Sequence, residues 1–469
     1  MKSMRDLAAP TCTVKLAEDC AGLGTGFCIC KRTAHKLNQK IVGGKRIHID
    51  PVYMSESHPP LRKFLKHKWP LTKIVDDSVH GSDSRGDQLL GNDGDLDIYI
   101  AGGSCQPFSK QGKNTGRKDS RSNTTRDAVD FIKTRRPKSF IMEQVKNITS
   151  KTHKKWLDHR VLRVLKKITS YNGRKLYKVR TEIYDSAEFG TPQIRKRLYI
   201  IGVRKDIPSL RRFKMPTRGN GRPKSLASLV PTRMPTSGQQ VEDWELTYTE
   251  SRNWNGIRGQ LEARSDVKFP VIGDFQQSKA FGLSLQERKC MTITKSRAQS
   301  RAFWIIDKCK DGSLTKRRLT VRDYAQLMGW DKKSQTQYLG IDQFHCPRND
   351  SQPLPVRIKG VSYGSKLSQS QLLAALGNSF SVPVFQAIVE GLLRCFSGHP
   401  PSDSDSDSDS DNGGEPHEWE HYCPDKRKLP RPADDFHTPI KKRKIQERSF
   451  KRSGAMMFGG QPGLAKAGK

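Results

Sequence analysis

The sequence predicts a doubly wound α/β fold with a mostly parallel sheet, a smaller second domain and a disordered C-terminal tail. Three observations support this. Short apolar segments alternate with amphipathic ones over residues 1–205. The periodicity then fades over residues 206–290, which are rich in Pro, Gly, Arg and Trp, and returns over 291–398. From residue 399 a tail with a Ser-Asp repeat follows, and such a repeat cannot bury apolar area.

The individual elements follow from local patterns. "TVKLAEDCAGLGTGFCICK", residues 13–31, is typical of an apolar strand, a glycine turn and the start of a helix. Further strands are expected at residues 46–50, 72–77, 95–103 and 139–145, and an amphipathic helix at 126–136. Residues 317–330 and 372–396 have helix-like patterns. Strands that alternate with helices favour a parallel sheet, because parallel neighbours need a crossover connection.

The strongest compositional feature is the net charge of +37. The tail from Ser402 holds 13 of the 85 basic residues and 12 of the 48 acidic ones, so the first 401 residues carry +36. A field of this size attracts polyanions, and nucleic acid is the usual one inside a cell. Charge alone leaves open a merely soluble cationic surface.

Several patterns bear on the compartment. No apolar run reaches 18 residues and the first thirty lack a signal-peptide layout, so we expect a soluble, intracellular protein without a membrane partner. The ten cysteines lack the spacing of a disulfide framework or a zinc site, so we expect reduced thiols and no metal. Residues 426–444, "KRKLPRPADDFHTPIKKRK", carry two basic clusters that favour nuclear import, with a solvated charge run as the alternative.

One cysteine stands apart from the others. In "GGSCQPFSKQG", Cys105 follows an expected strand and two glycines, which places it at the carboxyl edge of a parallel sheet, where α/β folds bind ligands. A thiolate is a strong soft nucleophile. From the residues alone, Cys105 could be a nucleophile, a metal ligand or a buried thiol.

This segment resembles the catalytic-loop motif of the DNA (cytosine-5)-methyltransferases. Five further segments resemble other motifs of that family in the family's order: "DCAGLGTGF", "FIMEQVKNI", "FGTPQIRKRLYIIGVR", "RRLTVRDYAQLMGW" and "ALGNSFSVPVFQAI". Six ordered motifs over about residues 14–393 are far more specific than any one of them. The resemblance implies a Rossmann-like methyltransferase fold, with residues 206–290 as the target-recognition domain.

The resemblance also implies a reaction and its residues. Cys105 would add to C6 of a cytosine in DNA, and C5 would then take a methyl group. Glu143 would act at N3 of the ring and Arg197 at O2, while Arg195 would contact phosphate. The cytosine would be flipped out of the duplex, with residues 109–126 closing over it as a lid.

The implied cofactor is S-adenosylmethionine. Gly22 and Gly24 would form the turn that lets the backbone approach it. Asp50 would bind the ribose, although strict alignment gives His48, and Asp76 would contact the adenine. Asn378 and Ser379 would complete the cofactor site; a capped helix start is the structural alternative for that Gly-Asn-Ser sequence.

The sequence departs from the family at several positions. Ser104 replaces the usual proline before the nucleophile, Gln144 replaces an asparagine, and Cys20 and Thr25 alter the glycine turn. Two alternatives to a DNA methyltransferase therefore stay open. One is a transfer-RNA cytosine-5 methyltransferase, although the Cys-Phe-Thr sequence of those relatives is absent; the other is a catalytically silent DNA-binding relative.

Overall fold

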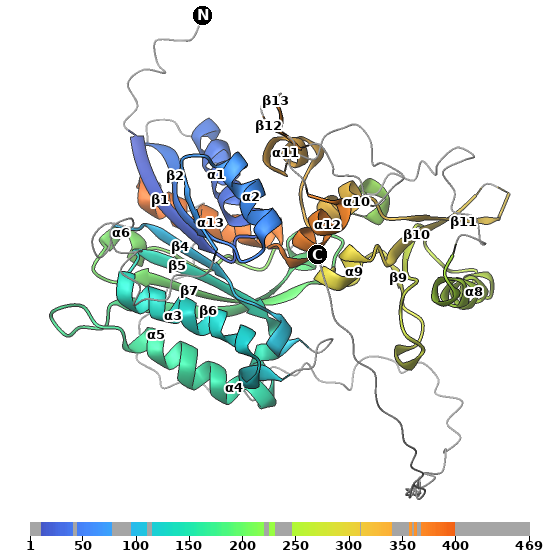
Figure 1. Ribbon diagram of the computed structural model, residues 1–469, viewed down its shortest axis with the longest axis horizontal. Helices are drawn as coiled ribbons and strands as arrows, with labels where there is room; N and C mark the ends of the chain where they lie inside the picture. The colour runs from blue at the N-terminus through green and yellow to red at the C-terminus, as the bar shows by residue number, and fades with distance from the viewer. Residues whose placement is uncertain are drawn as a thin grey trace, which may run out of the picture. The chain divides into compact units, whose positions relative to one another are not determined.

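The structure is a computed structural model of the 469-residue chain (Figure 1). It describes residues 11–40, 45–76, 95–109, 115–219, 225–229, 246–309, 311–339, 356–358, 361–363 and 367–398. The expected tail, 399–469, and the basic clusters at 426–444 lie outside these residues.

The main feature is a seven-stranded sheet in the order β3-β2-β1-β4-β5-β7-β6. Its strands are β1 (Thr11–Asp19), β2 (Arg46–Ser55), β3 (Lys73–Val75), β4 (Ile98–Gly102), β5 (Ser139–Val145), β6 (Tyr177–Asp185) and β7 (Lys196–Arg204). The first five run parallel, and β7 runs antiparallel to both β5 and β6. This confirms the predicted doubly wound, mostly parallel fold.

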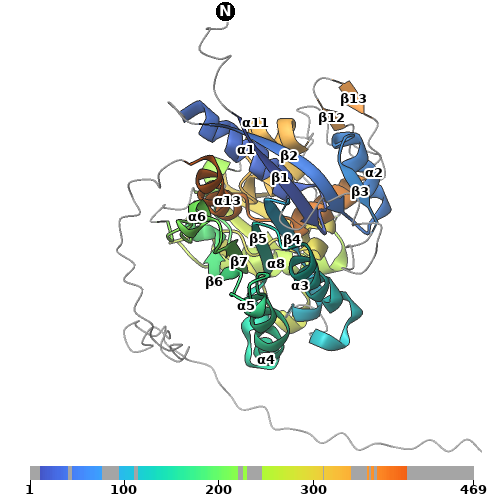
Figure 2. The same ribbon diagram turned by 90° about the vertical axis from the view of Figure 1, so that its left-hand side faces the viewer.

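Helices cover both faces of this sheet (Figures 1 and 2). Side chains of α1 (Thr25–Lys40), α2 (Pro59–Lys68) and α13 (Val382–Ser397) share one core, and those of α3 (Asn123–Arg135), α4 (Lys151–Leu157) and α5 (Arg163–Lys167) share the other. β4 shows the alternation: Ile98 and Ile100 lie in the first core, and Tyr99 and Ala101 in the second. Burial on both faces explains why such strands read as continuous apolar runs.

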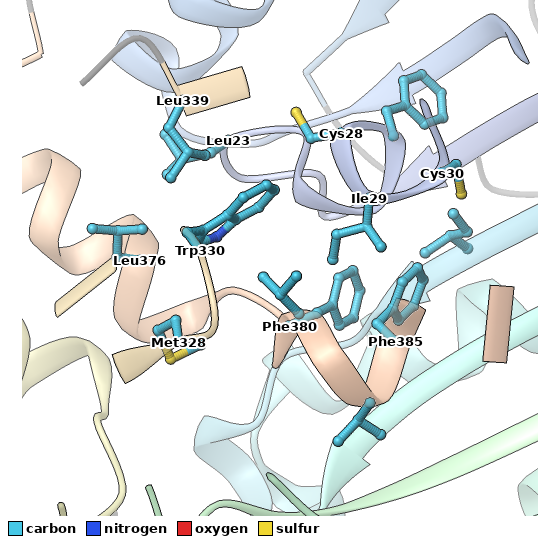
Figure 3. Close-up of a cluster of buried hydrophobic side chains, with 14 of the residues drawn as sticks. Leu23, Cys28, Ile29, Cys30, Met328, Trp330, Leu339, Leu376, Phe380 and Phe385 are labelled. Carbon is cyan, nitrogen blue, oxygen red and sulfur yellow. The ribbon is translucent and has the colours of Figure 1, made fainter. Parts of the chain in front are cut away.

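The last two described helices have different neighbours: the first packs on residues 295–299 and the second on α1. α12 (Gln369–Asn378) and α13 are separated by a break at residues 379–381, so the expected helix over 372–396 is in fact two helices. Figure 3 shows Leu376 of α12 and Phe380 of the break in one apolar cluster with Ile29, Met328 and Trp330. Within the described residues no single helix is long and apolar enough to cross a membrane; α12 and α13 meet that test only together, with a 55° bend between them.

A second sheet of four antiparallel strands follows the order β11-β10-β8-β9. Its strands are β8 (Val271–Asp274), β9 (Leu285–Glu287), β10 (Phe303–Lys308) and β11 (Leu314–Arg318), and α8 (Tyr248–Glu262) packs on it. Its core is a stack of aromatic rings, with Phe275 between Trp254 and Trp304 at centroid distances of 5.7 and 4.7 Å.

This small sheet corrects two expectations. The boundary at residue 290 falls inside it, because β10 and β11 pair with β8 and not with the main sheet. The expected helix over 317–330 consists of the end of β11 followed by α10 (Val321–Leu327). The other described helices and strands are α6 (Pro208–Arg211), α7 (Leu226–Leu229), α9 (Lys295–Gln299), α11 (Lys332–Ser334), β12 (Val356–Ile358) and β13 (Val361–Tyr363).

Candidate active site

The residues expected to carry the chemistry meet at the carboxyl edge of the parallel strands. From β1 the chain moves outward to β2 and β3 and then returns to β4 on the other side of β1. In open α/β sheets such a reversal marks the crevice, at the carboxyl ends of the two central strands, where ligands bind. The glycine turn at residues 20–24 follows β1, and the Cys105 segment follows β4. The two motifs are therefore neighbours in space although about 80 residues separate them in the sequence.

Cys105 lies immediately before a short 3-10 turn, Gln106–Phe108. Phe108 anchors that turn: its ring is buried against His153 and Trp156, at centroid distances of 5.3 and 5.1 Å. Asn147 Nδ2 also donates a hydrogen bond of 2.8 Å to the Phe108 carbonyl. The cysteine is half-buried on a turn whose far end is held in the core.

Gln144 and the first turn of α3 brace the backbone before the cysteine. The Ser104 amide donates to Thr124 Oγ1 at 2.9 Å, and Gln144 Nε2 donates to the Ser104 carbonyl at 3.3 Å and to Thr125 Oγ1 at 2.9 Å. Gly103 lies so close that an added Cβ would be 2.8 Å from both Gln144 Nε2 and Thr125 Oγ1. Serine at position 104 does not fix φ as proline would, so the backbone before Cys105 is less restricted. The hydrogen bonds with Thr124 and Gln144 hold this backbone in place instead.

We expect Thr124→Val to slow turnover about tenfold, because it leaves the Ser104 amide without its acceptor. Ser104→Pro in the Thr124→Val background should recover part of that loss, since proline has no amide hydrogen and fixes φ. Steady-state kinetics of the four proteins in the cycle measure the coupling. Strictly additive effects of the two substitutions would count against the brace.

Glu143 and Arg197 come from antiparallel neighbours, β5 and β7, and form a close ion pair. Arg197 Nε lies 2.9 Å from Glu143 Oε1, and both residues are less than a tenth exposed. The pair is misaligned for a hydrogen bond, and Oε1 accepts none from any residue the structure describes. A buried oxygen without a hydrogen-bond partner needs an explanation. One that fits this position is a ligand whose polar edge supplies the partner.

The surroundings of Cys105 affect the pKa of its thiol in opposite directions. Burial raises the pKa of the thiol above its ordinary value, the Arg197 charge lowers it, the Glu143 carboxylate raises it, and Arg195 lowers it. Near neutral pH the resting thiol is therefore mostly protonated. Its reactivity depends on the balance between one carboxylate and two guanidinium groups.

We expect the pH dependence of Cys105 alkylation to move in opposite directions in two variants. Arg197→Gln removes a cation that stabilises the thiolate, so the pKa of Cys105 rises and the midpoint moves to higher pH. Glu143→Gln removes an anion, so the pKa falls and the midpoint moves to lower pH. Iodoacetamide labelling followed by peptide mass spectrometry measures both midpoints. Shifts in the same direction would contradict this account.

Arg195, which was expected at a phosphate, is buried in this structure. Its side chain is 2% exposed, and its guanidinium donates to the carbonyls of Ile293, Gly377 and Ser379. Burial lowers the pKa of this arginine to about 10, but it stays charged near neutral pH. The first arginine of "QIRKR" therefore faces the interior, and only Arg197 pairs with Glu143.

The glycine turn has the conformation that the sequence predicts. Gly22 and Gly24 have φ values of 57° and 66°, in the left-handed region that favours glycine. The Gly22 amide donates to Glu56 Oε2 at 2.7 Å, and a Cβ added at Gly22 would meet nothing within 4 Å. Open space beside a backbone turn leaves room for a ligand to approach.

The structure places the expected ribose acid, Asp50, inside β2 and away from the carboxyl edge. β2 continues to Ser55, so Asp50 lies five residues, about 16 Å, before its carboxyl end. The buried acid at that end is Glu56. Pro51 did not end the strand because the β1–β2 register shifts between Leu16 and Ala17, whose partners are Pro51 and Tyr53.

Of the other cofactor candidates, two are exposed and one is buried. Asp76 is exposed directly after β3, which places it at the carboxyl edge. Asn378 is exposed at the last residue of α12, and Ser379 is buried, its hydroxyl donating to the Leu376 carbonyl at 2.7 Å. The Gly-Asn-Ser sequence therefore ends a helix, which corrects the alternative of a capped helix start.

These groups fit a nucleoside with an amino-acid chain. Each Glu56 oxygen accepts one backbone amide, from Gly22 and His58, and a carboxylate can accept about four hydrogen bonds, so capacity remains for two ribose hydroxyls. Asp76 and Asn378 add two exposed polar side chains. The donor set is what S-adenosylmethionine would require.

Comparisons with known proteins agree with this geometry. The sequence model of the family "C-5 cytosine-specific DNA methylase" matches residues 27–351, which include Cys105, Glu143 and Arg197. The type II methyltransferase M1.ScrFI of Lactococcus lactis subsp. cremoris is 28% identical over 302 residues, 64% of this chain and 62% of that protein. M.NlaX of Neisseria lactamica is 26% identical over 307 residues, 65% of this chain and 78% of that protein.

Among solved structures, the DNMT2 mutant of Spodoptera frugiperda is 15% identical, with a TM-score of 0.48, and the comparison covers 81% of this chain and 99% of that one. The match to M1.ScrFI covers less than two thirds of that relative's length. The family match, in contrast, covers more than half of the present chain and its three central site residues. The chain belongs to the C-5 cytosine-specific DNA methylase family.

Proposed function

We propose that this protein methylates C5 of cytosine in DNA, with S-adenosylmethionine as the methyl donor. The observation that carries the proposal is the placement of the buried Glu143–Arg197 pair and Cys105 at one sheet edge, with Glu143 Oε1 free of hydrogen bonds from described residues. Family membership supports the same reaction.

The proposed mechanism gives each side chain one role. The Cys105 thiolate adds to C6, which places electron density on C5 and negative charge toward N3 and O2 of the ring. Glu143, which takes up a proton when the cytosine binds, holds that proton at N3, and the Arg197 guanidinium stabilises the charge at O2. Loss of the C5 proton and elimination of the Cys105 sulfur then restore the aromatic ring and the free thiol.

The cofactor would lie on the β1–β2–β3 side of the crevice. Glu56, Asp76 and Asn378 would hold it around the turn of Gly22 and Gly24. When bound, S-adenosylmethionine supplies the electrophilic methyl group that C5 receives. These residues would orient the cofactor beside Cys105, which follows β4, the neighbour of β1 in the sheet.

The proposed substrate is duplex DNA with the target cytosine flipped out. The net charge of +36 on residues 1–401 suits phosphate binding. Flipping costs a few kcal/mol of unstacking, which contacts outside the pocket must offset. The described part of the expected lid, residues 115–126, begins beside the catalytic turn and carries Arg121 and Arg126. We assign target recognition to the small sheet and α8, and nuclear localisation to residues 426–444.

Covalent trapping tests the proposal. The protein is incubated with S-adenosylmethionine and oligonucleotides that contain 5-fluorocytosine, because fluorine at C5 cannot leave as a proton and the Cys105 adduct persists. Duplex DNA should give an adduct that survives denaturing electrophoresis. An adduct with RNA alone would replace DNA by RNA as substrate. Salt-sensitive binding without an adduct, and without transfer of a labelled methyl group, would show a silent binder.

A further inference from the structure

Arg195 has a position that the catalytic reaction does not explain. Its guanidinium is buried, and its Nη atoms donate at 2.7 Å to the Ile293 carbonyl, at 3.3 Å to the Gly377 carbonyl and at 2.7 Å to the Ser379 carbonyl. Its own amide donates to Asp185 Oδ1 at 2.9 Å. One side chain thus joins the backbone of three segments that are far apart in the sequence.

Two of these carbonyls flank Asn378 on both sides. They belong to the carboxyl end of α12, where carbonyl groups lack helical partners and carry partial negative charge. This explains how a guanidinium can be buried here with carbonyl dipoles as hydrogen-bond partners. Asn378 itself is exposed. The buried Arg195 guanidinium therefore fixes the carbonyls on either side of a residue whose own side chain is accessible.

The third carbonyl lies where the chain returns from the small sheet. Cys290 pairs with Gln193, and the Cys290 amide donates to the Pro192 carbonyl at 2.5 Å. α9, which begins at Lys295, packs so tightly on α12 that a Cβ added at Gly377 would lie 2.6 Å from the Thr294 carbonyl oxygen. A small displacement of the backbone at residues 293–295 would therefore displace the backbone at Gly377.

Arg195 is also two residues from Arg197, at the start of β7. Arg195 directly precedes β7, which begins at Lys196. Glu143 and Arg197 both contribute to the electrostatics of Arg195, and Arg195 contributes to those of Cys105. The clamp therefore adjoins the pair that is assigned to the cytosine.

From this geometry we infer that Arg195 is a positioning residue that couples the cofactor side of the crevice, through Asn378, to the strand that carries Arg197 and to the return segment of the small sheet. The inference rests on the proposed function, because it takes Asn378 as a cofactor contact. Arg195 acts through the backbone and touches neither cytosine nor phosphate.

Calorimetric titration with S-adenosylhomocysteine tests the inference on the full-length protein. Arg195→Gln should weaken binding about tenfold or more, since a charge-assisted clamp is lost. Arg197→Gln, which removes the same group two positions away, should leave this affinity within about twofold, while it lowers the yield of the fluorocytosine adduct. Arg195→Lys should resemble Arg195→Gln, because one ammonium cannot reproduce the forked geometry.

A double-mutant cycle separates positioning from general destabilisation. Asn378→Ala alone should weaken cofactor binding, and Arg195→Gln/Asn378→Ala should weaken it no more than the larger single effect. Additive losses, or an unchanged affinity in Arg195→Gln, overturn the inference. If Arg195→Gln does not fold, Arg195→Lys takes its place in the cycle. Wild-type protein that neither binds the cofactor analogue nor forms the adduct would instead refute the proposed function.

Discussion

Replacing Cys105 with alanine should abolish methyl transfer and the fluorocytosine adduct together. Among the described cysteines with a shifted pKa, only Cys105 has Glu143 and Arg197 among the causes, so we expect no other thiol to form the bond to C6. We expect turnover to fall at least about 1,000-fold, the scale seen when a nucleophile is removed. DNA affinity should change little, because phosphate contacts dominate binding.

Cys309→Ala is the matched control for that experiment. Cys309 is exposed and directly follows β10 of the small sheet. The Cys309→Ala protein should therefore retain full activity and adduct yield. Intact-protein mass spectrometry after trapping gives the stoichiometry, and peptide mapping gives the site. An adduct on any cysteine other than 105, or residual turnover within tenfold of wild type in Cys105→Ala, would contradict the assignment of the nucleophile.

The central strands β4 and β5 of the main sheet could be predicted because they are buried on both faces, whereas β6, which is only partly buried, and β7 were not among the expected strands. Residues 139–145 form β5 with the expected bounds, since this apolar run is packed between two helical layers. The small sheet could not be predicted. Its strands are short and antiparallel, and one connection runs from β9 through α9 to β10, so no regular spacing marks them as one unit.

Site residues could be predicted where neighbours in the sequence determine their position. They could not be predicted where the position depends on the end of a strand or on contacts between residues far apart in the sequence. Cys105 and the glycine turn follow from residues adjacent in the sequence. Glu56 was missed because a proline made the strand seem to end at Asp50, when a register shift accommodates it. The one sequence signal was the continued apolar pattern in "VYMS" up to the first acid.

The two arginines of one motif show the same limit. Arg195 and Arg197 have the same side chain and lie two residues apart, so the sequence cannot tell which of them pairs with Glu143. The difference comes from α12, whose carboxyl end lies over Arg195 and supplies it with carbonyls 182 and 184 residues away. Gln144 likewise acts on Ser104 and Thr125, at sequence separations of 40 and 19.

Glu143→Gln should give the second large loss of activity, with a cause distinct from that in Cys105→Ala. Glutamine keeps the shape and can donate a hydrogen bond to N3, but it cannot transfer a proton there as the thiolate adds. We expect the single-turnover rate to fall about 100- to 10,000-fold, the usual contribution of a positioned acid. Arg197 loses its carboxylate, so affinity for the phosphate-bearing substrate should be retained or increased.

Glu182→Gln provides a matched control on the same row of the sheet. Glu143 on β5 and Glu182 on β6 are both register partners of Tyr199 on β7, which lies between them. Glu182, however, forms its ion pair with the largely exposed Arg218, at 2.6 Å, and an exposed ion pair contributes little to stability. Rapid-quench measurement of labelled methyl transfer should show wild-type rates for Glu182→Gln. If Glu143→Gln also reacted within tenfold of wild type, proton donation at N3 would have to come from another group, and the buried Glu143–Arg197 pair would be structural.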